Sequence, residues 1–184
     1  MSGAAAHVDP SNKKIALLIA MLALVLAFSE TLGKASQTQA LTHNIEAANL
    51  WNFFQAKTIR MTTLRTAAES LSAQTGSQAS DATGAQIAKW RETADRYDSE
   101  PSTGEGRKEL AARAKAAEDK RDRSMAAYHQ YELASGAVQI AIVLASAAII
   151  TGITALTWIA GGLGIVGVVF SLIGLLAPTA VHLF

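Results

Sequence analysis

The 184-residue chain contains no cysteine, so disulfide bonds, thiolate metal sites and cysteine nucleophiles are excluded. Aromatic residues make up only 6% of the chain, and proline occurs three times. Alanine is abundant, which favours closely packed helices over strands. A strong charge of either sign is also missing, because the formal net charge is +1 at pH 7. Proteins that bind nucleic acid usually need a basic face, so we expect no nucleic acid partner.

Charged residues are absent from a long block near the C-terminus, residues 136–177. About 20 apolar residues are enough for a helix to cross the hydrocarbon core of a bilayer, so this block is long enough for two helices. We expect the turn between them at Thr154–Gly162, where Trp158 would lie among the headgroups and Gly161-Gly162 interrupts the apolar pattern. The predicted segments are transmembrane helices at 135–155 and 159–177 and a C-terminal tail at 178–184.

A second apolar run, Ile15–Phe28, follows Lys13-Lys14 near the N-terminus. It resembles a secretory signal, with Ala27-Phe28-Ser29 as a cleavage site between small residues. The apolar character continues to Gly33, however, and the run is then long enough to span a membrane. We therefore interpret 15–33 as a first, uncleaved transmembrane helix, preceded by an N-terminal tail at 1–14.

The polar portion, residues 34–134, carries helical periodicity. Stretches rich in glycine, serine and proline interrupt it at 74–85 and 99–106. An outgoing arm of roughly 39 residues would reach about 60 Å, and the returning arms would cover a similar distance. The predicted fold is therefore an all-α membrane protein with three transmembrane helices and a long, coiled-coil-like helical hairpin inserted between the first and the second.

The densest aromatic cluster lies on the outgoing arm. At about 100° per residue, Trp51 and Phe54 share a helix face, whereas Phe53 points away from both. Lys57 and Arg60 follow on the next turns. Three interpretations remain open: a core within the hairpin, a contact between subunits, and a cation–π ligand site.

Small residues recur at three- and four-residue steps along the last predicted helix, among them Gly164, Gly167 and Ser171. In lipid, small residues let the backbones of two helices approach closely. An alanine-rich composition can produce such stripes by chance. Here the small residues align among bulky apolar ones, which favours a contact with a second copy of the chain.

Glu30 is the one carboxylate inside a predicted membrane helix. An ionisable group at that depth is a functional candidate. Lys34 lies at i+4, in the favoured order of Glu before Lys. An ion pair near the membrane interface is the interpretation that we favour over ion or proton conduction.

No group of residues indicates catalysis. The four histidines lack metal-ligand spacing and are His7, His43, His129 and His182. We therefore expect no enzymatic activity, no metal and no cofactor.

Three strings resemble a family of bacterial membrane proteins known as domain of unknown function 4337. They are IEAANLWNFFQAKTIRMTTLRTAAE, ETLGKASQTQAL and YELASGAVQIAIVLASAAIITG, and the pattern at Trp51–Lys57 is the most specific part. The resemblance covers 15–177 and implies three membrane helices with a helical insert. It implies no activity, substrate or cofactor. Relatives often carry Lys or Arg in the last turn, which this chain lacks.

The positive-inside rule places Lys13-Lys14, and with them the N-terminus, in the cytoplasm of a bacterium. A multi-pass protein of the inner membrane would then hold 34–134 in the periplasm and the Thr154–Gly162 turn in the cytoplasm. We expect membrane lipid, further copies of the chain and another membrane complex as partners. The function that we predict is a self-associating scaffold or accessory subunit. The alternative is a component of an oligomeric channel or transporter.

Overall fold

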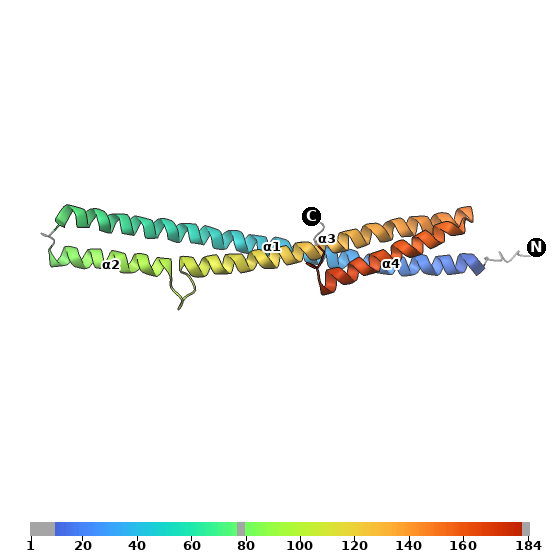
Figure 1. The fold of residues 1–184 in the computed structure, drawn as a ribbon, viewed down its shortest axis with the longest axis horizontal. Coiled ribbons are helices and arrows are strands. Elements are labelled where there is room, and N and C mark those ends of the chain that lie inside the picture. The colour runs from blue at the N-terminus through green and yellow to red at the C-terminus, as the bar shows by residue number, and fades with distance from the viewer. Residues whose placement is uncertain (1–9, 77–79, 182–184) are drawn as a thin grey trace, which may run out of the picture. The chain divides into compact units, whose positions relative to one another are not determined.

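The computed structural model describes residues 10–76 and 80–181, and these residues contain helices and turns but no strand. The helices are α1 (Pro10–Thr75), α2 (Asp81–Asp98), α3 (Arg107–Thr151) and α4 (Thr154–Leu176) (Figure 1). The all-α prediction is confirmed. The predicted N-terminal tail differs from the structure, because α1 already begins at Pro10, and its first nine residues lie outside the described ones.

The chain divides into two compact units, which are described separately. Unit 1 contains Met1–Ala40 and Asp122–Phe184, and unit 2 contains Leu41–Arg121. Three helices, α1, α3 and α4, are long and apolar enough to cross a membrane by length and composition. The predicted first transmembrane helix, 15–33, and the outgoing arm of the predicted hairpin belong to one helix, α1, which runs through Gly33 and Lys34 without a break.

The turn between α3 and α4 lies at Gly152 and Ile153, not at Thr154–Gly162 as we predicted. Gly152 has a φ of +71°, a left-handed conformation that glycine adopts without steric cost. Gly161 and Gly162 lie inside α4. A helix satisfies all its backbone groups internally, so glycine is tolerated there in apolar surroundings.

The small residues of α4 pack inside unit 1. A Cβ atom on Gly164 would lie 2.6 Å from Cδ2 of Leu22 on α1. One on Gly167 would overlap the Val138 side chain of α3 and lie 3.2 Å from the carbonyl oxygen of Ala134. This stripe is therefore filled by the chain's own α1 and α3. Our expectation that it receives a second copy is not supported.

Ser171 extends this contact through a polar pair. Its hydroxyl lies 2.8 Å from that of Ser29 on α1, which is fully buried. Each hydroxyl also lies 2.9 Å from a carbonyl oxygen one turn earlier in its own helix, that of Val25 or of Gly167. The two serines therefore satisfy each other's polar groups within the apolar unit.

Unit 2 pairs α1 with α2 and the first part of α3 in antiparallel fashion. Arg65 contacts Asp95, and Trp51 contacts Glu118. Later residues of α2 and α3 therefore lie against earlier residues of α1. Along α1, residues that are not exposed recur every seven positions: Ala47, Phe54, Met61 and Ala68. The helix α2 begins five residues earlier than the predicted 86, because the Ser80 side chain caps it by accepting a hydrogen bond from the Thr83 N–H.

The packing of α4 yields a first prediction. Gly167→Leu should destabilise unit 1 by about 1–3 kcal/mol or more, because overpacking a close contact displaces its neighbours. Gly162→Leu is the matched control, since nothing lies within 4 Å of a Cβ at that position. Thermal unfolding of both variants in detergent measures the difference. Equal melting temperatures would contradict the described packing.

Candidate functional site

Trp51 and Phe54 belong to the interior of unit 2. Their rings meet edge to face, with centroids 5.4 Å apart and an interplanar angle of 82°. The indole Nε1 of Trp51 donates a hydrogen bond of 2.8 Å to Oε1 of Glu118. Both rings pack against the buried cluster that includes Leu50 and Leu110. These two aromatics therefore contribute to the core of the helix pair, the first of the three interpretations that the sequence left open.

Phe53 points the other way, as the helical periodicity predicts, and 59% of its surface is exposed. It borders a groove of about 510 Å³ whose floor is formed by Leu50 and Leu110. We call it the Phe53 groove. It is lined by Thr42, Ile45, Glu46, Asn49, Leu50, Phe53, Glu105, Leu110 and Arg113. An open apolar groove with acidic and basic side chains at its edge is typical of a protein–protein contact.

The two predicted cations of this region differ. The Nζ atom of Lys57 lies 5.0 Å from the centroid of the Tyr97 ring and 3.8 Å from Oε2 of Glu105. Arg60 is exposed on α1. The Phe54 ring already has a cation, because Cζ of Arg107 lies 4.9 Å from its centroid. The observed cation–π contacts are thus internal to unit 2, and a ligand site of that kind is not supported.

Polar contacts join the end of α2 to the start of α3, at a junction next to the loop that lines one side of the Phe53 groove. Asp98, the last residue of α2, binds Nη1 of Arg107 at 3.0 Å and Nζ of Lys108 at 2.9 Å. Arg107 also donates from Nε to Oγ1 of Thr58 at 2.8 Å, which ties the junction to α1. The intervening loop carries Glu105 to the groove. We did not predict these contacts from the sequence.

Glu109 closes the loop at its other end. It accepts hydrogen bonds from Oγ of Ser99 at 2.7 Å and from the N–H of Glu100 at 3.1 Å. Gly106 fits beneath it, because a Cβ there would collide with the Glu109 carboxylate and with backbone atoms of Ser99 and Glu100. Glu109 stands at the third helical position after Gly106, where a capping glutamate is common. That spacing is the signal by which the sequence could have revealed the junction.

The junction lowers the pKa of three carboxyl groups. The hydrogen bond from Lys108 is the main cause that lowers the pKa of Asp98, and the charge of Arg107 adds to it. The pKa of Glu109 is lowered chiefly by the hydrogen bond from Ser99. The pKa of Glu100 is lowered chiefly by Arg96, whose Nη2 lies 2.7 Å from Oε1. Ionisation of these groups therefore favours the folded state.

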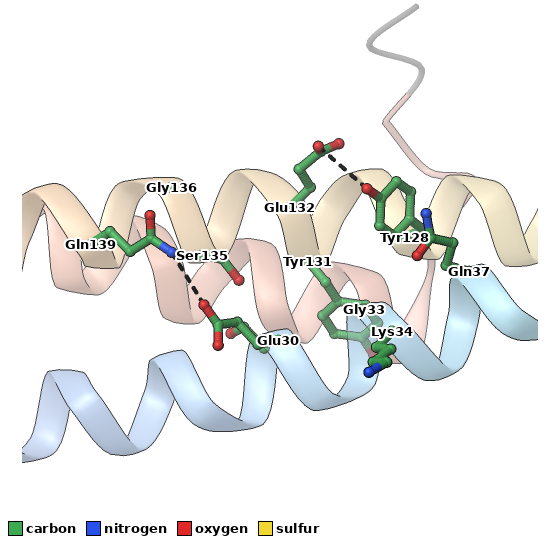
Figure 2. Close-up of a pocket in the computed structure, with 11 residues that line it drawn as sticks. Glu30, Gly33, Lys34, Gln37, Tyr128, Tyr131, Glu132, Ser135, Gly136 and Gln139 are labelled. Carbon is green, nitrogen blue, oxygen red and sulfur yellow. Dashed lines mark hydrogen bonds between the residues drawn. The ribbon is translucent and has the colours of Figure 1, made fainter.

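A second groove, of about 490 Å³, lies in unit 1 between α1 and α3 (Figure 2). We call it the Glu30 groove. Oε1 of Glu30 accepts a hydrogen bond of 3.2 Å from Nε2 of Gln139 on α3. Lys34 lies one turn further along α1 in Figure 2, and no ion pair joins it to Glu30 in the described part of the chain. The predicted Glu30–Lys34 pair is therefore replaced by an amide partner from another helix.

Aromatic and amide side chains surround the polar end of unit 1. The side chain of Tyr131 is buried, and its Cβ lies 3.2 Å from where a Cβ on Gly33 would be. Gln130 is buried and donates from Nε2 to the carbonyl oxygen of Val181 at 3.2 Å. The sequence showed these residues only as a polar-aromatic stretch before an apolar run. Their contacts with α1 and with the end of α4 depend on the fold.

Metal-ligating side chains do not gather in the described residues, since no three of His, Cys, Asp or Glu are placed to hold an ion there. His43 instead lies 3.4 Å from Glu46, and His129 lies 3.6 Å from Glu132. His7 and His182 are outside the described residues.

These features define a class: an all-helical protein with three helices able to cross a membrane. A family profile matches residues 11–177, and the chain belongs to that family, the domain of unknown function DUF4337. The resemblance identified from the sequence is thereby confirmed. Neither the curated proteins nor the solved structures include a match to this chain.

The junction leads to a prediction about acid. Because folding lowers the pKa of Asp98, its contribution to stability is present above its unfolded pKa of about 3.9 and is lost as the pH falls through the folded value. Asp98→Asn should lower the melting temperature more at pH 6 than at pH 3, because the contribution of the ionised carboxyl shrinks as the pH falls below about 3.9. Glu69→Gln, which removes an exposed carboxylate from α1, should match the unchanged protein at both values. Circular dichroism melts provide the measurement, and equal effects of Asp98→Asn at both pH values would contradict the assignment.

Proposed function

We propose that this chain is a non-enzymatic integral protein of the bacterial inner membrane that self-associates and acts as a scaffold or accessory subunit of a membrane complex. The observation that carries the proposal is the Phe53 groove in the polar portion of the chain. Membrane placement is supported by unit 1, and self-association by unit 2.

Unit 1 has small residues inside and large apolar residues outside. Its core contains Ala141, Ala145 and Ala160, all fully buried. The outward side chains are large and largely exposed: Leu17, Phe28, Val143, Ile150, Trp158 and Leu176. Water would make such a surface unfavourable, whereas lipid covers it without cost. Helices α1, α3 and α4 are therefore the three membrane spans of the proposal, with unit 2 between the first and the second.

Self-association is supported by the composition of the Phe53 groove. Its apolar floor lies outside the proposed membrane, where lipid cannot cover it. Its rim carries the acids Glu46 and Glu105 together with the base Arg113. Two copies related by a twofold axis could pair Arg113 of one with an acid of the other while each Phe53 enters the facing groove.

A channel or transporter component is the second candidate. Glu30 favours it, because its carboxylate faces an open groove in an apolar segment. The predicted spans, however, contain no other charged residue, and Glu30 is bonded to an amide rather than aligned with further acids. A conducting path usually needs several such groups, so we favour the scaffold.

The orientation can be tested with single cysteines, because the chain has none of its own. Lys13-Lys14 predict that the start of α1 and the α3–α4 turn face the cytoplasm. Ser102→Cys in the unit 2 loop should react with a membrane-impermeant thiol reagent in intact spheroplasts. Thr151→Cys at the turn should react only after lysis. The reverse pattern would contradict the orientation.

Self-association depends on Phe53 in this proposal. Phe53→Ala should weaken the assembly by about 2 kcal/mol or more, as expected for a central aromatic anchor, without unfolding unit 2, because the side chain is exposed. Ile59→Ala is the matched control: its side chain is 66% exposed on α1 but lies outside the groove. The assembly mass is measured by light scattering in a mild detergent over a range of concentrations.

Two results would contradict this proposal. One is a monomer at every concentration together with no crosslink between copies in native membranes. The other is an equal effect of Phe53→Ala and Ile59→Ala, which would move the contact away from the Phe53 groove.

A further inference from the structure

Glu30 forms no ion pair with any residue that the structure describes. It is the only charged residue between Ile15 and Gly33, and 136–177 contains none. The hydrogen bond that Glu30 accepts comes from the neutral amide of Gln139 (Figure 2). A carboxylate in an apolar segment is costly unless a counter-charge meets it. Lys34 lines the same groove but forms no ion pair with Glu30 among the described residues, so a cation that binds Glu30 directly must come from a ligand.

The Glu30 groove has the donors and the space for such a cation. The Nε2 atom of Gln139 is used by Glu30, which leaves its Oε1 atom as an acceptor beside the carboxylate. Ser135 lines the same part of the groove. Gly33 and Gly136 also line it, and their lack of side chains keeps it open. The volume of about 490 Å³ is far more than one water molecule needs.

We infer that the Glu30 groove binds a primary ammonium group that is linked to a phosphate, as in the headgroup of phosphatidylethanolamine. The carboxylates of Glu30 and Glu132 line the groove together with neutral oxygens, and such acceptors suit a cation with directional N–H donors. A calcium-type site would need six to eight oxygen ligands, usually with several carboxylates. Lys34 lines the groove one turn further along α1 and provides a cation for the phosphate. This inference rests on the membrane placement proposed above.

A lipid and a soluble molecule could both carry this zwitterion. The structure favours the lipid, because large apolar side chains flank the groove on both helices. Phe28 on α1 and Ile140 on α3 are more than half exposed and adjoin the lining residues Ser29 and Gln139. Acyl chains attached to a bound headgroup would cover these side chains.

Native mass spectrometry of the full chain in detergent tests the inference with three lipids of identical acyl chains. Phosphatidylethanolamine supplies N–H donors, phosphatidylcholine a quaternary ammonium without them, and phosphatidylglycerol no ammonium. We expect phosphatidylethanolamine to be retained about tenfold better than phosphatidylglycerol, the change that one hydrogen bond to a charged group produces. Phosphatidylcholine should be retained less well than phosphatidylethanolamine. Glu30→Gln should abolish the preference, and Glu69→Gln, which removes the same charge elsewhere on α1, should preserve it.

Free phosphoethanolamine distinguishes the two sources. If it raises the melting temperature of the unchanged protein as much as the lipid does, and Glu30→Gln removes that effect, the zwitterion site stands and its ligand is soluble. Equal retention of the three lipids without an effect of phosphoethanolamine would overturn the inference, as would a preference that persists in Glu30→Gln. The lipid comparison on the unchanged protein is decisive even if the variant does not fold.

Carbonate extraction of the unchanged protein separates this inference from the proposed function. A chain that stays in carbonate-washed membranes but does not discriminate among the lipids refutes only the headgroup site. A chain released by carbonate refutes the membrane placement itself.

Discussion

Both units depend on close contact between helices at small side chains. In unit 1, Gly164 and Gly167 bring α4 against α1 and α3, and fully buried alanines continue the contact. In unit 2, Ala68, Ala94 and Ala114 occupy fully buried positions. Backbones that approach so closely leave little room between them for large side chains. Many of the bulky apolar residues must therefore lie on the outside, and this constraint explains the surface of the whole chain.

The consequence differs between the units. Lipid can cover the outward apolar side chains of unit 1. Phe53 lies in unit 2, the polar portion of the chain, where lipid does not cover it. Alanine occupies many core positions of unit 2 beside Leu50, Met61 and Leu110, and this limits the apolar area that the unit buries. Unit 2 compensates with specific polar contacts: the Trp51–Glu118 hydrogen bond and the two ion pairs of Asp98. These contacts set the alignment of α2 and α3 on α1, and so they shape the Phe53 groove.

The two grooves therefore suit two different partners. The Phe53 groove combines an apolar floor with charges of both signs, which suits another protein surface. The Glu30 groove presents the carboxylates of Glu30 and Glu132 and the ammonium group of Lys34 beside an apolar flank, which suits a zwitterionic lipid headgroup. Scaffolding with bound lipid is a coherent combination of roles for a chain of this composition.

The sequence by itself determined the elements of the fold. Apolar runs, helical periodicity and the breaks at 74–85 and 99–106 predicted the helices and the end of α2 at Asp98. The three apolar stretches predicted helices able to span a membrane. The opposite directions of Phe53 and Phe54 also followed from the sequence, because the angle between successive helical residues is fixed at about 100°. These properties depend on neighbours along the chain, which the sequence states directly.

Tertiary structure decided which surfaces meet. Local pattern placed the last turn at Thr154–Gly162, but the chain reverses at Gly152, which has a positive φ. The i, i+4 spacing predicted an ion pair between Glu30 and Lys34. In the structure, Glu30 instead accepts a hydrogen bond from Gln139, more than a hundred residues away. The glycine stripe of α4 was visible as a contact surface, but a stripe does not say whether it meets its own chain or another. Such choices depend on contacts between distant segments, and these form only when the helices pack.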